Sequence, residues 1–339
     1  MTVTYDVEFN SAAHYPAPDV PDLAERAEAA GFGAYWKGES NSTDPLVLLS
    51  AIASRTASIR LGTAIYHIFG RSPITLGIQA ATLQDLSGGR LILGLGVANH
   101  AIAAWHGGTF DRPLRRMREY IEVVKATARG DRVEYDGETV TTGKSFRLAW
   151  KPSYPDVPVV VAGLGEQMTR MIGRYGEGVV LNMATPEKIR EIAARVRGAA
   201  KEAGRDPDQV AIIAKARVSL HHDRAVARER LRGVLTFYNV AEFYGEMLIA
   251  QGFGEQVNAV REGFREGGFK AATARITDDY MDQLPALAAT SIDEVKDRLQ
   301  PYAEAGATRI IIPYVPAGDD VVADARRFMS AWEAAAGRP

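Results

Sequence analysis

The sequence predicts an α/β fold of the TIM-type (β/α)8-barrel class, in which parallel strands alternate with helices. Strand and helix patterns alternate from the first residues to the last, and they give about eight βα units in 339 residues. The strand expected at 91–95 is apolar at every position but one glycine, which is typical of a parallel strand buried on both faces. No linker rich in proline, glycine and serine divides the chain, so we expect one domain over residues 1–339. A doubly wound sheet is the structural alternative.

The expected elements follow in order along the chain. The strand patterns cover 3–9, 33–36, 59–66, 91–95, 157–161, 178–181, 210–220 and 308–313. The helical patterns cover 22–30, 45–56, 74–86, 113–129, 166–175, 186–203, 292–305 and 320–335. Two stretches interrupt the alternation. Residues 131–149 contain two alternating runs around Asp136-Gly137 and predict a β-hairpin insertion. Residues 223–288 predict a helical insertion without a strand.

Composition and charge narrow the class of protein. The formal net charge is −2 with both signs interspersed, so neither nucleic acid nor a membrane surface is expected as a partner. The chain has no cysteine, which excludes disulfides, thiolate catalysis and cysteine-ligated metals. The six histidines form no pattern typical of metal ligands, so no metal is expected. Because neither a signal peptide nor an apolar run of about 20 residues is found, we expect a cytoplasmic protein.

Glycines gather at both ends of the strand expected at 91–95. Ser87-Gly88-Gly89-Arg90 predicts a turn with positive φ before it. Gly94 and Gly96 remove side chains at its carboxyl end, as Gly62 does in the strand expected at 59–66. Two interpretations are open: these glycines either fit a crowded barrel interior or let a ligand approach the backbone.

A second glycine segment lies directly before a helix. Gly163-Leu164-Gly165 leads into the helix expected from Glu166. Backbone N–H groups at a helix N-terminus bind phosphate, so this segment either receives a phosphate or is an ordinary turn. It lacks the third glycine of a dinucleotide fingerprint, and no P-loop lysine follows.

Polar side chains follow three of the expected strands. Glu39 follows the second strand, His67 the third and His100 the fourth. In a barrel these positions share one mouth, where a carboxylate or an imidazole can act as an acid or a base. The aromatic residues of the helical insertion, such as Phe237 and Tyr244, either wall a pocket there or belong to the core. No GxSxG motif is present, so serine hydrolysis has no support.

Several segments carry a resemblance to a known family. The sequence resembles the luciferase-like flavin and deazaflavin oxidoreductases at 27–36 (AEAAGFGAYW), 59–63 (IRLGT), 71–73 (RSP) and 81–96 (ATLQDLSGGRLILGLG). It resembles the branch near methylenetetrahydromethanopterin reductase at 66–73, 159–168 (VVVAGLGEQM) and 177–182 (EGVVLN). The resemblance implies a TIM-type barrel, commonly a homodimer, that uses the deazaflavin F420, with FMN as the alternative cofactor.

The resemblance also implies roles for individual residues. It places a non-proline cis peptide at Ala64-Ile65, behind the deazaflavin ring. Many relatives carry histidine where this chain has Ser40 and glutamate where it has Asn99, so Glu39, His67 and His100 remain as catalytic candidates. The residues that the resemblance assigns to the cofactor are Glu39, Ser40, Ala64, Ile65, Gly96, Val97, Ala98, Asn99, Ala162, Gly163, Leu164, Gly165, Glu166, Gln167 and Asn182.

The resemblance therefore implies an F420-dependent oxidoreductase. Hydride would pass between the deazaflavin C5 and a C=C, C=N or carbonyl/alcohol group of a small organic substrate. Two alternatives are an FMN-dependent luciferase-like monooxygenase and a non-catalytic barrel that binds flavin or another ligand. A Rossmann-type dehydrogenase has less support, because no GxGxxG follows the first expected strand.

Overall fold

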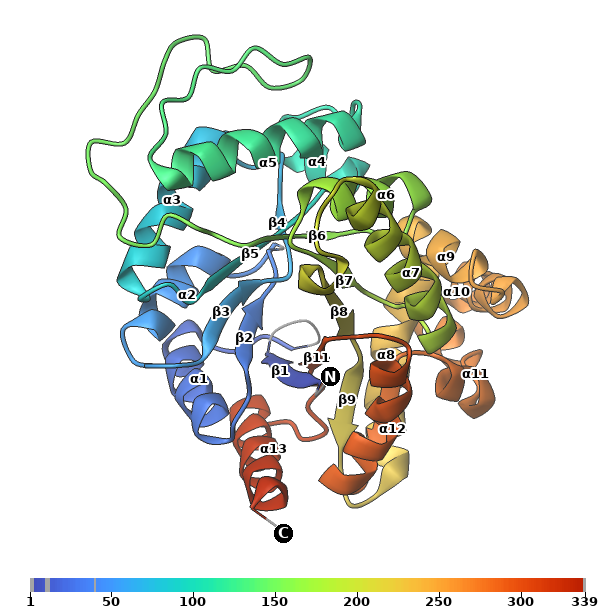
Figure 1. The fold of residues 1–339 in the computed structure, drawn as a ribbon. Coiled ribbons are helices and arrows are strands. Elements are labelled where there is room, and N and C mark those ends of the chain that lie inside the picture. Colours follow the sequence, from blue (N-terminus) through green and yellow to red (C-terminus); the bar gives the residue numbers. More distant parts are fainter. Residues whose placement is uncertain (1–2, 10–12, 40, 338–339) are drawn as a thin grey trace.

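The computed structural model describes residues 3–9, 13–39 and 41–337, and its central feature is a closed parallel barrel (Figure 1). The eight barrel strands are β1 (Thr4–Glu8), β2 (Ala34–Lys37), β3 (Arg60–Thr63), β5 (Leu91–Gly96), β6 (Val159–Ala162), β7 (Gly178–Leu181), β8 (Ala211–Lys215) and β11 (Arg309–Pro313). β1 pairs with both β2 and β11, and β3 pairs with β5, so that the sheet has no open edge. The predicted fold class is confirmed.

Helices surround the barrel strands (Figure 1). They are α1 (Val20–Ala29), α2 (Pro45–Ala53), α3 (Pro73–Leu86), α5 (Pro113–Arg129), α6 (Glu166–Tyr175), α7 (Pro186–Glu202), α12 (Ile292–Glu304) and α13 (Val321–Ala336). Several begin with a proline in the first turn after a residue whose side chain accepts a backbone hydrogen bond, as Ser72 does for α3 and Thr185 for α7. All eight lie within three residues of the predicted bounds.

Three strand expectations are corrected by the structure. The strand expected at 59–66 is interrupted at Ala64-Ile65, whose peptide bond is cis as the resemblance implied, and continues as β4 (Tyr66–His67) beside β5. The strand expected at 210–220 divides at Ala216 into β8 and β9 (Arg217–Leu220). The segment 223–288 was expected to hold no strand, but β10 (Ala286–Ala289) begins within it and pairs with β9 in parallel.

The two insertions extend from the barrel. Residues 131–149 form an antiparallel excursion with bridges at Val133–Phe146 and Asp136–Thr141 rather than two regular strands, and they project above α5 in Figure 1. The helical insertion consists of α8 (Arg224–Val240), α9 (Glu242–Ile249), α10 (Gly254–Ala274) and α11 (Asp278–Gln283).

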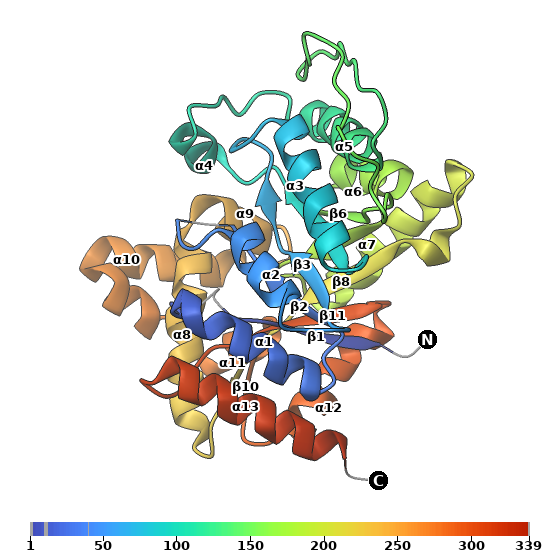
Figure 2. The same ribbon diagram turned by 90° about the vertical axis from the view of Figure 1, so that its left-hand side faces the viewer.

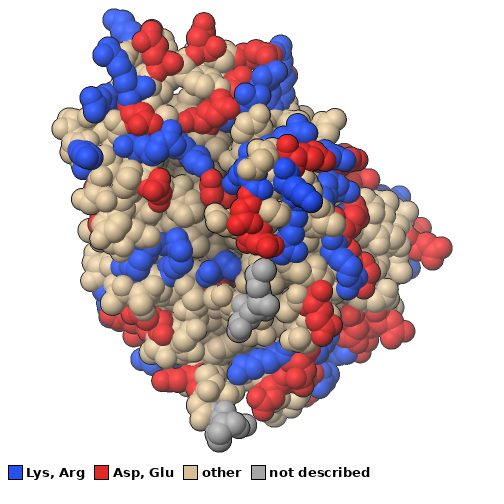
Figure 3. Space-filling view, in the orientation of Figure 1, with Lys and Arg blue, Asp and Glu red and all other residues tan. Residues whose placement is uncertain are grey.

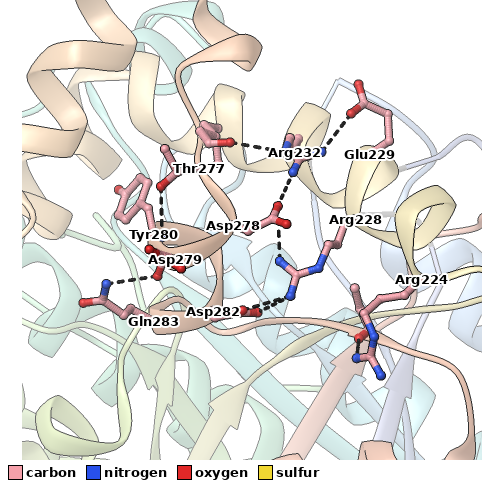
Figure 4. A network of polar contacts seen from close by, with 12 residues as sticks. Arg224, Arg228, Glu229, Arg232, Thr277, Asp278, Asp279, Tyr280, Asp282 and Gln283 are labelled. Carbon is pink, nitrogen blue, oxygen red and sulfur yellow. Dashed lines mark hydrogen bonds and ion pairs between the residues drawn. The ribbon is translucent and has the colours of Figure 1, made fainter.

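An ion-pair network fixes α11 against α8 (Figure 4). Arg228 contacts Asp278 at 3.2 Å and Asp282 at 2.9 Å, and Arg232 also binds Asp278. Arginines four residues apart lie on one face of a helix, so α8 presents both guanidinium groups to α11. Exposed pairs contribute little singly, and we interpret the network as orienting the insertion.

The lower part of the barrel is filled by side chains, which leaves the carboxyl ends of the strands for a site. Trp36 is fully buried there, and a Cβ on Gly62 would lie 2.2 Å from its indole ring. The indole N–H donates to Asp6, which also pairs with Arg309. Gly62 therefore fits a crowded interior, one of the two interpretations left open above.

Two further features of the fold are the distribution of surface charge and the character of the helices. Lysine, arginine, aspartate and glutamate side chains are interspersed over the face shown in Figure 3. Among the residues that the structure describes, no helix combines the length and the apolar character needed to cross a membrane.

Candidate active site

A cavity of about 1030 Å³ lies at the carboxyl ends of the barrel strands. Its wall includes residues of α8, α9 and a short helix that the sequence did not predict, α4 (His100–Trp105). α4 and α9 lie on the same side of the barrel, opposite the N-terminus (Figure 2). This is the end at which sites of parallel barrels form.

Most of the residues assigned to the site by the sequence line this cavity. Those that do so are Glu39, Ala64, Ile65, His67, Gly96, Val97, Ala98, Asn99, Ala162, Gly163, Leu164 and Asn182. Gly165, Glu166 and Gln167 lie exposed at the start of α6, beyond the cavity wall. His100 is exposed on α4 and packs against Phe110, so the structure does not bring it to the wall. Ser40 lies outside the described residues.

The glycines of β5 make room for the irregular segment between β3 and β4. A Cβ on Gly94 would lie 1.8 Å from the Thr63 carbonyl oxygen, and one on Gly96 would lie 2.6 Å from Ile65 Cδ1. The Thr63 hydroxyl donates to Gly94 O and accepts from Gly94 N–H. The space that side chains would take at Gly94 and Gly96 is thus filled by protein, and Ala64 and Ile65 line the cavity beside Gly96.

The start of α6 offers backbone donors beside the cavity. Gly165 precedes the helix and has no side-chain hydrogen bond that caps it. A Cβ on Gly165 would meet nothing within 4 Å. Because the first N–H groups of a helix have no partner within it and carry partial positive charge, this end suits a phosphate.

Glu39 and His67, two of the catalytic candidates, are bound to each other. Glu39 Oε2 accepts from the His67 backbone N–H at 3.0 Å and lies 3.1 Å from His67 Nε2, while Oε1 accepts from Arg71 at 2.8 Å. His67 Nδ1 accepts from Gly70 N–H at 3.1 Å, so the ring proton is on Nε2 and the imidazole is neutral. Burial lowers the pKa of His67, although Glu39 acts in the opposite direction. Both side chains therefore hold the loop after β4 and have few atoms left for a ligand.

Arg71 extends this network to the next loop. Its guanidinium binds Asp44 at 2.7 Å and lies 4.2 Å from the centre of the Tyr66 ring. Asp44 also accepts from the Tyr66 hydroxyl at 2.7 Å and caps α2 through Val47 N–H. The loops after β2 and β4 are thereby joined at the cavity mouth.

The floor of the cavity carries an ion pair that sequence reasoning missed. Lys215 Nζ lies 2.6 Å from Glu8 Oε2 and 3.4 Å from the Ala64 carbonyl oxygen, and both charged side chains line the cavity while almost fully buried. Lys37 lies close by, and burial lowers its pKa to about 8. The available signal was a charged residue at the last position of a mostly buried strand, as in β1, β2 and β8.

Aromatic side chains of the insertion line the cavity, and two of them, Tyr238 and Tyr244, also pack in a hydrophobic cluster, so both interpretations hold in part. Phe237, Tyr238, Phe243 and Tyr244 of α8 and α9 line the cavity, as does Trp105 of α4. Trp105 is 64% exposed and Phe237 57% exposed, so the rim of the cavity is apolar. In the described part of the chain, no group of three or more His, Asp or Glu residues could hold a metal ion.

Comparisons with known proteins agree with this architecture. Residues 4–309 match the model of the luciferase-like monooxygenase family. The chain is 29% identical over 291 residues to a 5,10-methylenetetrahydromethanopterin reductase of Archaeoglobus fulgidus, which covers 84% of this chain and 86% of the relative. It is 28% identical over 322 residues to a putative coenzyme F420-dependent oxidoreductase of Mycobacterium tuberculosis, with 88% of this chain and 91% of the relative covered.

Solved structures show the same fold. The coenzyme F420-dependent tetrahydromethanopterin reductase of Methanopyrus kandleri superposes with a TM-score of 0.83 at 24% identity over 98% of both chains. An F420-dependent secondary alcohol dehydrogenase in complex with an F420-acetone adduct gives a TM-score of 0.77 at 21% identity, again over 98% of both chains. From the match to its family model, this chain belongs to the luciferase-like monooxygenase family.

Proposed function

We propose that the protein is an F420-dependent oxidoreductase that moves a hydride between the deazaflavin C5 and a small organic substrate. The observation that carries the proposal is the cavity, which has Ala64 and Ile65 in its wall and an uncapped helix N-terminus just beyond it, in a chain with F420-dependent relatives. Its volume of about 1030 Å³ is at the upper end of ordinary ligand pockets, which supports a cofactor and a substrate together.

The residues present fit such a cofactor. Ala64 and Ile65 would support the ring on one side, and the N–H groups at the start of α6 would bind the phosphate. When bound, F420 supplies the two-electron hydride chemistry at C5. The protein then has to exclude water, orient the substrate and handle one proton.

We assign the role of proton donor to Lys215. Glu39 and His67 bind each other, whereas the Lys215 ammonium has three N–H donors, of which Glu8 and Ala64 O engage two. The third is left for a ligand. The contact with Glu8 Oε2 at 2.6 Å holds the Lys215 side chain in place beside the cavity.

The first experiment compares cofactors. Apo protein titrated separately with F420 and FMN, followed by fluorescence, is expected to bind F420 and to bind FMN much more weakly. Tight FMN binding without F420 binding would refute the proposal and favour a luciferase-like monooxygenase. F420 binding without oxidation of reduced F420 by any enone, imine or ketone in a broad panel would favour the non-catalytic barrel.

A second experiment tests the proton donor. Lys215→Met should lower kcat by about 100-fold, the range of general acid catalysis, while the Kd for F420 changes little. Lys37→Met is the matched control, because Lys37 is a buried lysine nearby that does not line the cavity. Equal losses in both variants would contradict the assignment. The homodimer implied by the resemblance stays a prediction, which sedimentation velocity can check.

A further inference from the structure

Arg217 is a buried cation with no counter-ion among the residues that the structure describes. Its side chain is fully buried at the start of β9, and no carboxylate among residues 3–9, 13–39 and 41–337 forms an ion pair with it. The guanidinium instead donates to Asn182 Oδ1 at 2.9 Å, to the Tyr238 hydroxyl and to Met183 Sδ at 3.3 Å. It also lies 4.3 Å from the centre of the Tyr238 ring. A buried charge is normally paired, so this arrangement calls for an explanation.

The contacts of Arg217 determine what its two cavity-lining neighbours can do. A guanidinium only donates hydrogen bonds, so Asn182 and Tyr238 must both face it with an oxygen that accepts. The Asn182 NH2 group and the Tyr238 hydroxyl proton are then free to donate elsewhere. Both residues line the cavity, and within the described chain neither group has a protein acceptor.

The segment that holds Asn182 is itself fixed in place. Met183 adopts a left-handed conformation with φ of 55°, which is uncommon for a residue other than glycine. Its carbonyl oxygen accepts from the Gln251 side chain at 2.9 Å, and the same amide accepts from Thr185 N–H at 3.1 Å. This places Met183 Sδ against Arg217 and sets the direction of Asn182.

We propose that Arg217 is a positioning residue that makes Asn182 and Tyr238 a pair of donors for a carbonyl or carboxylate oxygen of the substrate. The inference rests on the proposed function and narrows its substrate class. An anionic oxygen bound there would balance the positive charge of Arg217, which has no counter-ion in the described chain. The exposed Trp105 and Phe237 at the rim of the cavity suit an apolar substrate body. The substrate class is therefore an apolar, often aromatic, compound that bears such an oxygen. Asn182 then serves the substrate rather than the cofactor.

The experiment uses two probes of similar size, benzoate and benzyl alcohol, with the F420-loaded protein in isothermal titration calorimetry. The readout is the ratio of the two affinities, because a variant that merely loosens the fold weakens both. Tyr238→Phe and Asn182→Leu should each lower the preference for benzoate by about tenfold, as expected for a charged hydrogen bond. Arg217→Met should abolish the preference, and Arg217→Lys should restore only part of it, because lysine lacks the planar fork of donors with which arginine reaches both oxygens.

Tyr244→Phe is the matched control, since it removes a hydroxyl from the same wall that has no hydrogen bond with Arg217 in the described chain. A ratio within twofold of wild type in both Tyr238→Phe and Asn182→Leu overturns the inference, as does an equal loss in Tyr244→Phe. The Kd for F420, measured on the same variants by fluorescence, separates the ligands. If the variants lose affinity for F420 alone, the oxygen that Asn182 and Tyr238 bind belongs to the cofactor, and the inference is again overturned. Apo wild-type protein titrated in the same way that prefers benzoate but does not bind F420 refutes the proposed function alone.

Discussion

Replacing Gly96 by alanine tests how the cavity wall is built. The new Cβ would lie 2.6 Å from Ile65 Cδ1 and 2.7 Å from Cγ1. Carbon atoms in contact are about 3.5–4.0 Å apart, so the Ile65 side chain would have to move by about 1 Å. Because the obstacle is a flexible side chain, we expect a loss of about 1–3 kcal/mol in the free energy of unfolding, the usual cost of overpacking. Ile65 lines the cavity, so F420 affinity should fall by about tenfold, which corresponds to about 1.4 kcal/mol.

Two other glycines calibrate this result. Gly94→Ala would place a Cβ 1.8 Å from the Thr63 carbonyl oxygen, and because backbone cannot yield, we expect a loss of more than about 4 kcal/mol or failure to fold. Gly165→Ala meets nothing within 4 Å at an ordinary φ of −69°, so its stability should stay within about 0.5 kcal/mol of wild type. Urea unfolding and fluorescence titration with F420 measure both effects. Wild-type stability and affinity in Gly96→Ala would refute this account of the wall.

Three more predictions concern buried or half-buried basic side chains and can be checked by urea unfolding. Arg90 donates five hydrogen bonds to Ser87, Thr56, Ile59 and Ala53, so Arg90→Lys should lose about 2–4 kcal/mol; a loss below about 1 kcal/mol would contradict this. Burial lowers the pKa of His67 below 6.5, so the unfolded chain binds more protons than the folded chain below that pH, and the free energy of unfolding falls as the pH is lowered. His67→Gln should remove this part of the pH dependence. An unchanged slope of the free energy of unfolding against pH would argue against it. Burial lowers the pKa of Lys37 from 10.5 to about 8, so keeping this side chain charged in the folded protein costs about 3 kcal/mol of stability at pH 7. Lys37→Met should therefore be more stable than wild type at pH 7, and this gain should shrink as the pH rises from 8 to 10.5.

Local pattern was sufficient for most of the barrel elements. The bounds of α6 and β7 match the expectation, because amphipathic period and flanking glycines act over a few residues. β10 was missed, since Ala286–Ala289 (ALAA) has little intrinsic strand preference. Its strand conformation comes from pairing with β9, which lies far away in the sequence.

The site was predictable as a set of positions but not as a set of partners. Strand-end location and family resemblance pointed to Glu39, His67 and Asn182, and all three line the cavity. Neither source could show that Glu39 and His67 bind each other, or that Lys215 of β8 contacts Glu8 of β1, which is two strands away in the barrel. Such pairings depend on side-chain direction at the closed mouth, which a one-dimensional pattern does not encode.

By itself the sequence determined the alternation of strands and helices, the family and the end of the barrel that carries the site, because periodicity, glycine turns and strand ends are local properties. The tertiary structure decided which polar groups remain available. It showed that the glycines of β5 accommodate Thr63 and Ile65 rather than a ligand, and that Arg217 faces Asn182 and Tyr238 without a counter-ion in the described chain. The physical reason is that hydrogen-bond and charge saturation is a property of three-dimensional neighbours, and it is settled only when the barrel closes.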